Sequence, residues 1–314
     1  MSSNAALGRA EGDLFTRRVC EQLENGIKTC RIQHPHFDNH DAAELCKALS
    51  EEHSRVQKLE FYKCPSLGSK GITDVAKILH NTKTVTRWDI ASVSIGDEGL
   101  QAITQLLESE SCPLEWLSLV DISGLEKGDE PHLITLETWN HFFQAALKSD
   151  SKLKSLDLTH NFLTLDHMEE LSNCLRLNTT LESLILSRNP LGDDGVCMLC
   201  CHALQANTAL TLLALGDCNI SNEGSSALAK CLRTKNCHLE RVYLYANPHI
   251  TVTDSNSKEE VLYWLDVNSK GRKMIREQAC RSEYVPIILA KVTGQLDHLY
   301  GLFHEYVAAH CQKH

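Results

Sequence analysis

The chain has 314 residues, a formal net charge of −10 and 42% apolar residues. The acidic balance argues against a nucleic-acid-binding protein, which would need a basic stripe for the phosphate backbone. No run approaches the roughly 18 consecutive apolar residues of a membrane span, and the first residues lack the basic start and apolar core of a secretory signal. We therefore expect a cytoplasmic protein, with a nuclear location left open, that binds neither nucleic acid nor membrane.

Residues 1–26 precede the regular part of the sequence and are predicted to form a helix. The residues that give the helical spacing are Leu14, Phe15, Arg18, Val19, Gln22 and Leu23. A stack of repeats needs a terminal element that covers its core. We therefore expect residues 1–26 to be an N-terminal helical cap.

From residue 27 onward the pattern L-x-x-L-x-L-x-x-N/C-x-L recurs at a nearly constant step. Eight copies start at residues 27, 56, 85, 114, 153, 181, 210 and 239. A period of this length with this pattern is typical of leucine-rich repeats, with one short strand and one helix per unit. Residues 27–252 are thus predicted to form an α/β solenoid. It would be a right-handed β-α superhelix with parallel strands on its concave face and helices on its convex face.

The copy that starts at Leu181 shows the plan of one unit. Leu184 and Leu186 would point inward from the strand, and Asn189 would close the turn. GDDG starts a helix, for which Asp193 or Asp194 is a suitable cap. The buried stripe of that helix is predicted to consist of Val196, Leu199, Cys200 and Ala203. A full helix in each unit favours the ribonuclease-inhibitor-like subtype.

Two short segments contain metal-ligand residue types. HPHFDNHD places His34, His36, His40 and Asp41 close together, and CMLCCH spans Cys197 to His202. Imidazole, thiolate and carboxylate are the usual zinc ligands. The first segment is better explained as a solvated turn and the second as a repeat helix, on which consecutive residues face different sides. We predict no metal, no cofactor and no catalytic residue.

One unit is longer than its neighbours, and the pattern stops after the last one. The step of 39 residues implies an insertion near 123–137, with glycine, proline and acidic residues that favour an exposed loop. Such a loop is either tolerated or used for binding. Residues 253–314 have helical spacing of apolar residues and are predicted to form a C-terminal helical cap.

The 14 cysteines are expected to be reduced thiols, because the chain is large and has no secretory signal. Cys46 and Cys200 occupy a column of the repeat that holds small residues elsewhere. Cys218 takes the Asn/Cys position of its turn. Most of these cysteines are therefore interpreted as structural.

The strand residues that point away from the core would form the concave face. Eight strands at roughly 4.8 Å spacing give a surface about 35 Å long, which is enough for a protein-sized contact. Tyrosine and tryptophan are common at interaction hot spots. An alternative is that the C-terminal helices cover the aromatic end of this face. The partner-binding candidates are Tyr62, Arg87, Asp89, Trp116, Asp157, Ile185, Leu212, Tyr243 and Tyr245.

The repeats resemble those of ribonuclease inhibitor, Ran GTPase-activating protein and the NOD-like receptors. The phrases LNTTLESLILSRNPLGDDG and GDCNISNEGSSALAKCL carry the likeness to the last two groups. The resemblance implies a curved solenoid that binds on its concave face or edges. A NOD-like receptor would need a nucleotide-binding module, and no G-x-x-x-x-G-K-[ST] motif occurs. No matching motif places the catalytic arginine of the Ran family, so none is assigned.

We predict a non-enzymatic scaffold or adaptor that binds another protein, of unknown identity, on its concave face and is a monomer when unbound. The alternative is a GTPase-activating regulator of a small GTPase, by analogy with the Ran family. Such a protein could use an arginine to stabilise charge on the transferred phosphate. The exposed candidates at the repeat edges would be Arg87, Arg188 and Arg241.

Overall fold

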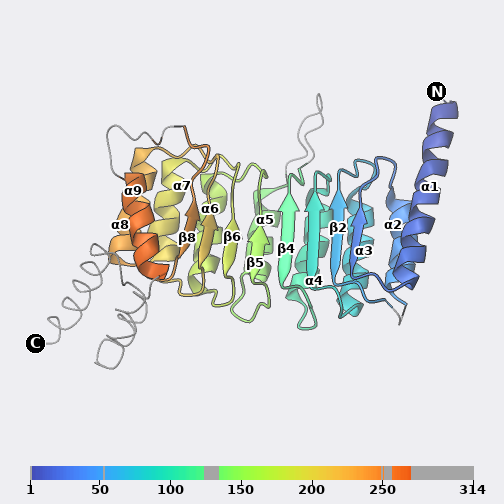
Figure 1. Cartoon of the computed structure of the whole chain (residues 1–314), viewed down its shortest axis with the longest axis horizontal. Helices are drawn as coiled ribbons and strands as arrows, with labels where there is room; N and C mark the ends of the chain where they lie inside the picture. Colours follow the sequence, from blue (N-terminus) through green and yellow to red (C-terminus); the bar gives the residue numbers. More distant parts are fainter. Residues whose placement is uncertain (1, 52–53, 124–133, 249, 251–256, 270–314) are drawn as a thin grey trace, which may run out of the picture.

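One eight-stranded parallel sheet runs through the repeats of the described chain (Figure 1). The computed structural model describes residues 2–51, 54–123, 134–248, 250 and 257–269, with side chains from residue 11. The strands pair in chain order, and the predicted solenoid is confirmed. They are β1 (Thr29–Ile32), β2 (Lys58–Tyr62), β3 (Arg87–Ala91), β4 (Trp116–Val120), β5 (Ser155–Asp157), β6 (Ser183–Ile185), β7 (Leu212–Ala214) and β8 (Arg241–Tyr243).

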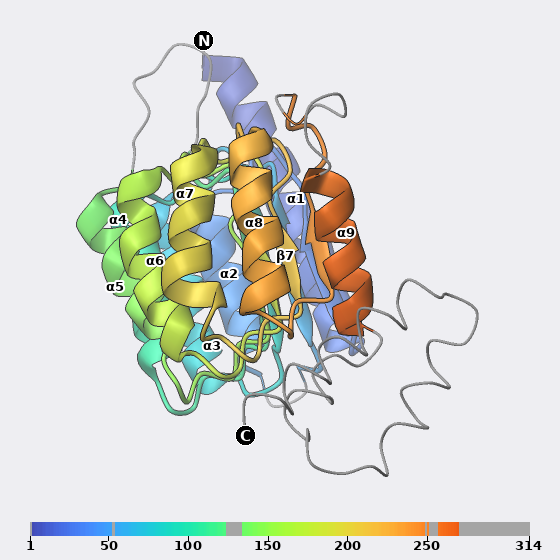
Figure 2. The same ribbon diagram turned by 90° about the vertical axis from the view of Figure 1, so that its left-hand side faces the viewer.

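The helices form a second layer on one face of this sheet, and Figure 2 shows α4 to α8 standing side by side. A helix follows each strand, as the repeat predicts. The helices are α1 (Ser2–Glu24), α2 (Asn39–Leu49), α3 (Ser69–Asn81), α4 (Gly96–Glu108), α5 (Leu136–Ala146), α6 (Leu165–Leu177), α7 (Gly192–Met198), the π-helix η1 (Leu199–Leu204), α8 (Asn222–Thr234) and α9 (Ser257–Val267).

The core lies between the sheet and the helix layer. Strand side chains alternate, so the fourth and sixth residues of each copy of the pattern point into this layer. Leu156, Leu184 and Leu213 are fully buried and pair in register between neighbouring strands. Burying one leucine side chain contributes about 1.5–3 kcal/mol. The repeated inward leucines therefore fix both the register of the strands and the face that stays open.

Hydrogen bonds from one repeat to the next help to hold the start of a helix in place. The carboxylate of Asp193 accepts hydrogen bonds from the backbone N–H groups of Ser221 (2.8 Å) and Gly224 (3.0 Å) in the next repeat. A Cβ on Gly224 would lie 2.5 Å from that carboxylate, so this close approach needs glycine. The prediction that Asp193 or Asp194 caps its own helix is wrong, because α7 begins after Leu191 without a side-chain cap.

Helix α1 packs against α2 at one end of the array. The residues that α1 buries are Gly12, Thr16, Val19 and Leu23, whereas Leu14 is 52% exposed. At the other end α9 packs against α8. No helix among the described residues combines the length and the apolar character that crossing a membrane requires.

Parts of two predicted segments lie outside the described residues. Of the insertion near 123–137, residues 124–133 are not described, and helix α5 already begins at Leu136 with Thr135 as its N-cap. The flanking Ser123 and Ile134 are buried. Of the segment 253–314 predicted as a C-terminal cap, only residues 257–269 are described, as α9 and the turn after it.

Candidate protein-binding surface

All nine predicted partner-binding residues lie on one face of the sheet, opposite the helix layer. We call this the open face; it corresponds to the concave face of the prediction. The size and charge of the outward residues change from the first strands of the sheet to the last. The face therefore has a charged section on β1–β4 and an aromatic section, named for Tyr243 and Tyr245, on β6–β8 and the residues just after β8.

The charged section is held together by ion pairs within and between neighbouring strands. Glu60 accepts from Arg31 Nε at 2.7 Å and lies 2.6 Å from Lys58 Nζ. Arg87 Nε contacts both carboxylate oxygens of Asp89, at 2.9 and 3.1 Å. The hydrogen bond from Arg31, together with the nearby Lys58, lowers the pKa of Glu60 to about 2. These cations and anions thus satisfy one another before any partner binds.

Two aromatic rings of this section are already covered by cations of the chain. The guanidinium of Arg87 lies 4.1 Å from the ring centre of Trp116, and Lys63 Nζ lies 5.1 Å from that of Tyr62. Cation–π contacts at such distances are stabilising. Trp116, which the sequence offers as a partner-binding candidate, is half-buried, and the guanidinium of Arg87 covers one face of its ring.

Asp157 separates the two sections and is half-buried on β5. Its carboxylate accepts hydrogen bonds from the backbone N–H of Thr159 (3.0 Å) and from the Thr159 hydroxyl (2.6 Å). Burial raises its pKa above the ordinary aspartate value, and the hydrogen bonds only partly oppose this.

Replacing Asp157 with asparagine is expected to raise Tm at pH 7. Because the pKa of Asp157 is raised in the folded state, the folded protein binds the proton more tightly than the unfolded chain. Ionisation therefore destabilises the fold as the pH rises from the unfolded pKa through the folded one. Asparagine keeps an acceptor for Thr159 and removes the charge. Thermal unfolding followed by circular dichroism should show a higher Tm for Asp157→Asn at pH 7 and equal values near pH 3.

The aromatic section exposes large side chains on the last strands. Tyr243 is 46% exposed and Tyr245 is 57% exposed, while Ile185 and Leu212 are half-buried beside them. No cation of the described residues lies over either tyrosine ring, in contrast to Tyr62. This is where the open face offers apolar surface to another molecule.

Two shallow hollows mark the open face. One, of about 410 Å³, runs along the strand beginnings and includes Trp116, Leu212 and Arg241. The other, of about 370 Å³, lies over the charged section at Glu60, Tyr62 and Asp89. Both are lined by predicted partner-binding residues, and both are polar at their margins.

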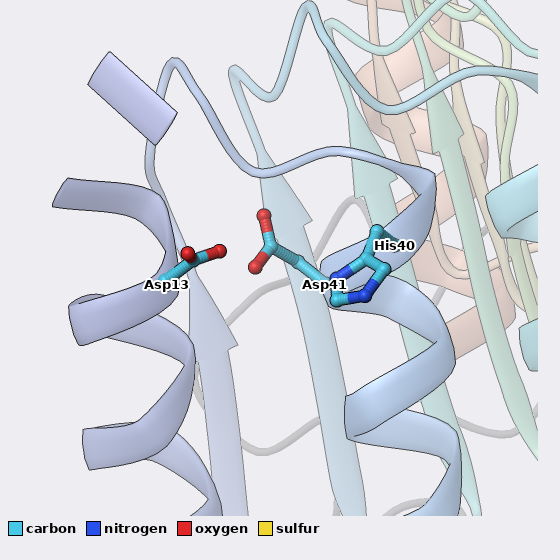
Figure 3. Close-up of side chains that lie close together, drawn as sticks. All are labelled: Asp13, His40 and Asp41. Carbon is cyan, nitrogen blue, oxygen red and sulfur yellow. The ribbon is translucent and has the colours of Figure 1, made fainter. Parts of the chain in front are cut away.

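The histidine-rich turn meets α1 (Figure 3). Ligand atoms of Asp13, His40 and Asp41 lie within 4.8 Å of one another, and the two carboxylates face each other. Asp41 accepts from the hydroxyl of Thr16 (2.8 Å) and from the backbone N–H of Asp38 (3.0 Å). These bonds dock α1 and complete the cap of α2, which accounts for the buried Asp41. Sequence reasoning missed Asp13, because it considered only the turn.

The cysteine-rich segment is divided between the core and the surface. Cys200 is buried, Cys197 is half-buried, and Cys201 and His202 are exposed. The twelve cysteines of the described residues are free thiols. Burial raises the pKa of Cys30 and of Cys46 to about 12, which keeps these thiols protonated and unreactive.

Comparison with known proteins finds the repeat in three places. The family model described as leucine-rich repeat matches residues 82–103, 177–200 and 206–229. The chain is 30% identical to ribonuclease inhibitor of Sus scrofa over 190 residues, which cover 60% of this chain and 33% of the relative. It is 27% identical over 207 residues to the human NACHT, LRR and PYD domains-containing protein 12, covering 60% of this chain and 19% of the relative.

The chain spans only part of these relatives. A third of the pig inhibitor is matched, and about half (53%) of the ribonuclease inhibitor of Mus musculus, which is 26% identical over 242 residues that cover 69% of this chain. Among solved structures, the TLR13–ssRNA13 complex gives a TM-score of 0.41 at 20% identity, covering 77% of this chain and 32% of that one. A score this low carries no argument beyond the fold seen directly.

The matched family model describes a repeat and not a catalytic domain. Three observations indicate the same kind of repeat. They are the 29-residue period, the eight-stranded parallel sheet with its layer of full helices, and the similarity to ribonuclease inhibitor and the NACHT relatives. The chain folds as a leucine-rich-repeat solenoid, and its repeats are similar to those of ribonuclease inhibitor and the NACHT, LRR and PYD domains-containing proteins.

Proposed function

We propose that this protein is a non-enzymatic interaction scaffold that holds a partner protein against the aromatic section of its open face. The observation that carries the proposal is the exposure of Tyr243, at the end of β8, and Tyr245, two residues later, on the open face. Tyrosines in such settings are enriched among interaction hot spots. Solenoids commonly bind along the extended surface that their repeats create. The relatives named ribonuclease inhibitor also act, by that name, on another protein.

The charged section is a weaker candidate for the main contact. Its ion pairs are already formed, and a partner that covered them would have to remove water from the more exposed Arg31 and Arg87 without offering better partners. Arg87 also covers one face of Trp116. We assign the charged section to the margin of the contact. There it would influence the orientation of the bound partner more than the affinity.

Affinity capture with matched surface variants tests the proposal. The protein is immobilised as wild type, as Trp116→Ala, as the double variant Tyr243→Ala/Tyr245→Ala and as Leu177→Ala. Leu177 is 63% exposed at the end of α6, in the helix layer, and is the control for general surface hydrophobicity. The proteins retained from a cell extract are identified by mass spectrometry.

We expect the wild type and Leu177→Ala to retain the same partner, and the tyrosine double variant to lose it. Trp116→Ala should retain it in reduced amount. An unchanged partner set with both the tryptophan and the tyrosine variants would exclude the open face as the binding surface. Loss with Leu177→Ala alone would place the contact on the helix layer.

GTPase activation has no specific support in the described surface. Arg87 is held by Asp89 and Trp116, while Arg188 and Arg241 are exposed without a feature that singles out either. We therefore expect no acceleration of GTP hydrolysis when the protein is added to a panel of small GTPases. An acceleration that Arg188→Ala or Arg241→Ala removes would contradict this expectation and identify the catalytic arginine.

A further inference from the structure

Gly216 lies directly beneath the ring of Tyr245. A Cβ added to Gly216 would fall 2.3 Å from Cζ, 2.5 Å from Cε2 and 2.6 Å from Cε1 of that ring. Real Cβ atoms essentially never come this close to a heavy atom to which they are not bonded. The ring therefore occupies the space that any other residue at position 216 would need for its side chain.

The ring lies with its face on the glycine. The Cβ position is almost equally distant from Cζ and from both Cε atoms, and the hydroxyl oxygen is not among the three nearest atoms. A Cβ in the plane of the ring and outside it could not lie at such nearly equal distances from these three atoms. One face of Tyr245 thus rests on the strand, and the opposite face contributes to the 57% of the side chain that is exposed.

Backbone hydrogen bonds hold the two positions in register. The N–H of Asp217 donates to the carbonyl of Tyr245 at 2.9 Å, and the N–H of Leu215 donates to the carbonyl of Tyr243 at 2.8 Å. The N–H of Gly216 donates to the hydroxyl of Ser187 at 3.2 Å. Gly216 and the backbone of Tyr245 are therefore fixed relative to each other, and only the ring of Tyr245 could move.

The outward side chains are smaller in this repeat than in the preceding one. The two outward residues are Ala214, which ends β7, and Gly216, which follows it, whereas the preceding repeat has Ile185 and Ser187 at the same positions. Ala214 is the register partner of Tyr243. The small residues of one repeat thus leave room for the tyrosines of the next.

We infer that Gly216 is a positioning residue, which lays Tyr245 flat on the sheet and so presents its free face to the partner. The inference rests on the proposed function, because it assigns a role to Gly216 in that binding surface. A side chain held in its bound orientation loses less conformational freedom on binding. Gly216 therefore contributes affinity without touching the partner.

The position of the ring is measured first in the free protein by NMR. Protons above an aromatic face are shifted upfield, so the α-protons of Gly216 should lie upfield in the wild type and move downfield in Tyr245→Leu. Gly216→Ala should displace the ring and change the Tyr245 ring resonances while Tm stays the same, because only the far end of an exposed side chain has to move. Equal Gly216 shifts in the wild type and in Tyr245→Leu would overturn the inference.

The binding role is measured by a double-mutant cycle with the partner recovered by the wild-type protein and identified by mass spectrometry. Gly216→Ala is expected to weaken binding about tenfold, which is the scale of freeing one anchored side chain and its contact. In a Tyr245→Leu background the same substitution should change the affinity no further, because Gly216 acts only through Tyr245.

The outcomes separate this inference from the proposed function. Wild-type affinity of Gly216→Ala, together with weak binding by Tyr245→Leu, would overturn the positioning role and leave the binding surface in place. An equal loss from Gly216→Ala in both backgrounds would show that Gly216 acts on the fold or touches the partner itself. Wild-type affinity of Tyr245→Leu would overturn the proposed surface at this end, and the role of Gly216 with it.

Discussion

Replacing Asn189 with alanine is expected to lower the free energy of unfolding by about 3–4 kcal/mol. Its side chain is fully buried in the turn after β6. The carbonyl oxygen accepts from the N–H groups of Asn161 (2.9 Å) and Leu163 (3.1 Å), and the amide donates to the carbonyls of Leu158 (2.9 Å) and Leu186 (2.8 Å). Alanine would leave these buried backbone groups without partners and open a small cavity.

A cysteine at the same position is the matched variant, because the chain itself uses cysteine in the next repeat. The thiol of Cys218 donates to the carbonyls of Leu186 (3.2 Å) and Gly216 (3.5 Å) but cannot replace the amide oxygen as an acceptor. Asn189→Cys should therefore lose less stability than Asn189→Ala. Urea unfolding followed by far-ultraviolet circular dichroism gives both values. A loss below about 1 kcal/mol for alanine would contradict the role of the turn.

Truncating Tyr243 and Tyr245 together is expected to weaken partner binding by about a hundredfold or more, since hot-spot aromatic residues typically account for about 2 kcal/mol or more each. Each single alanine variant should have a smaller effect. The two side chains lie on the same face two residues apart, so their contributions are expected to be non-additive. Isothermal titration calorimetry with the purified partner measures all three variants against the wild type.

Stability must be unchanged for that comparison to be valid. Both tyrosines are about half exposed and lie outside the buried core, so their loss should leave Tm close to the wild-type value. Arg31→Ala is a useful polar control on the charged section, where we expect at most a few-fold change in affinity. A larger effect from Arg31→Ala than from the tyrosine pair would move the main contact to β1–β4.

The architecture could be predicted because the constant period of the repeat determines which residues pair between neighbouring strands. Outside the 39-residue step, the inward apolar residues recur 28 or 29 residues later opposite their counterparts, as Leu156, Leu184 and Leu213 show. The face that each candidate occupies follows from strand alternation alone. Asn189 and Cys218 could likewise be assigned to the turn, because the pattern marks that position.

The side-chain conformation and contacts of each surface residue could not be predicted in the same way. Whether Trp116 is open depends on the side-chain conformation of Arg87 one repeat earlier, and the pattern says nothing about conformation. The orientation of the Tyr245 ring depends on Gly216, 29 residues earlier. In the repeat pattern Gly216 is only one more small residue, so the pattern gives no sign of this role. Asp193 supports the start of α8 in the following repeat and does not cap its own helix, because its carboxylate accepts hydrogen bonds from the N–H groups of Ser221 and Gly224.

Site-directed photo-crosslinking tests the central claim most directly. The photoreactive amino acid p-benzoylphenylalanine replaces Tyr243 on the open face or Leu177 on the helix layer, and the protein is irradiated with its partner. The account predicts a covalent adduct with the partner from position 243 and none from position 177. An adduct from position 177, with none from position 243, would contradict it.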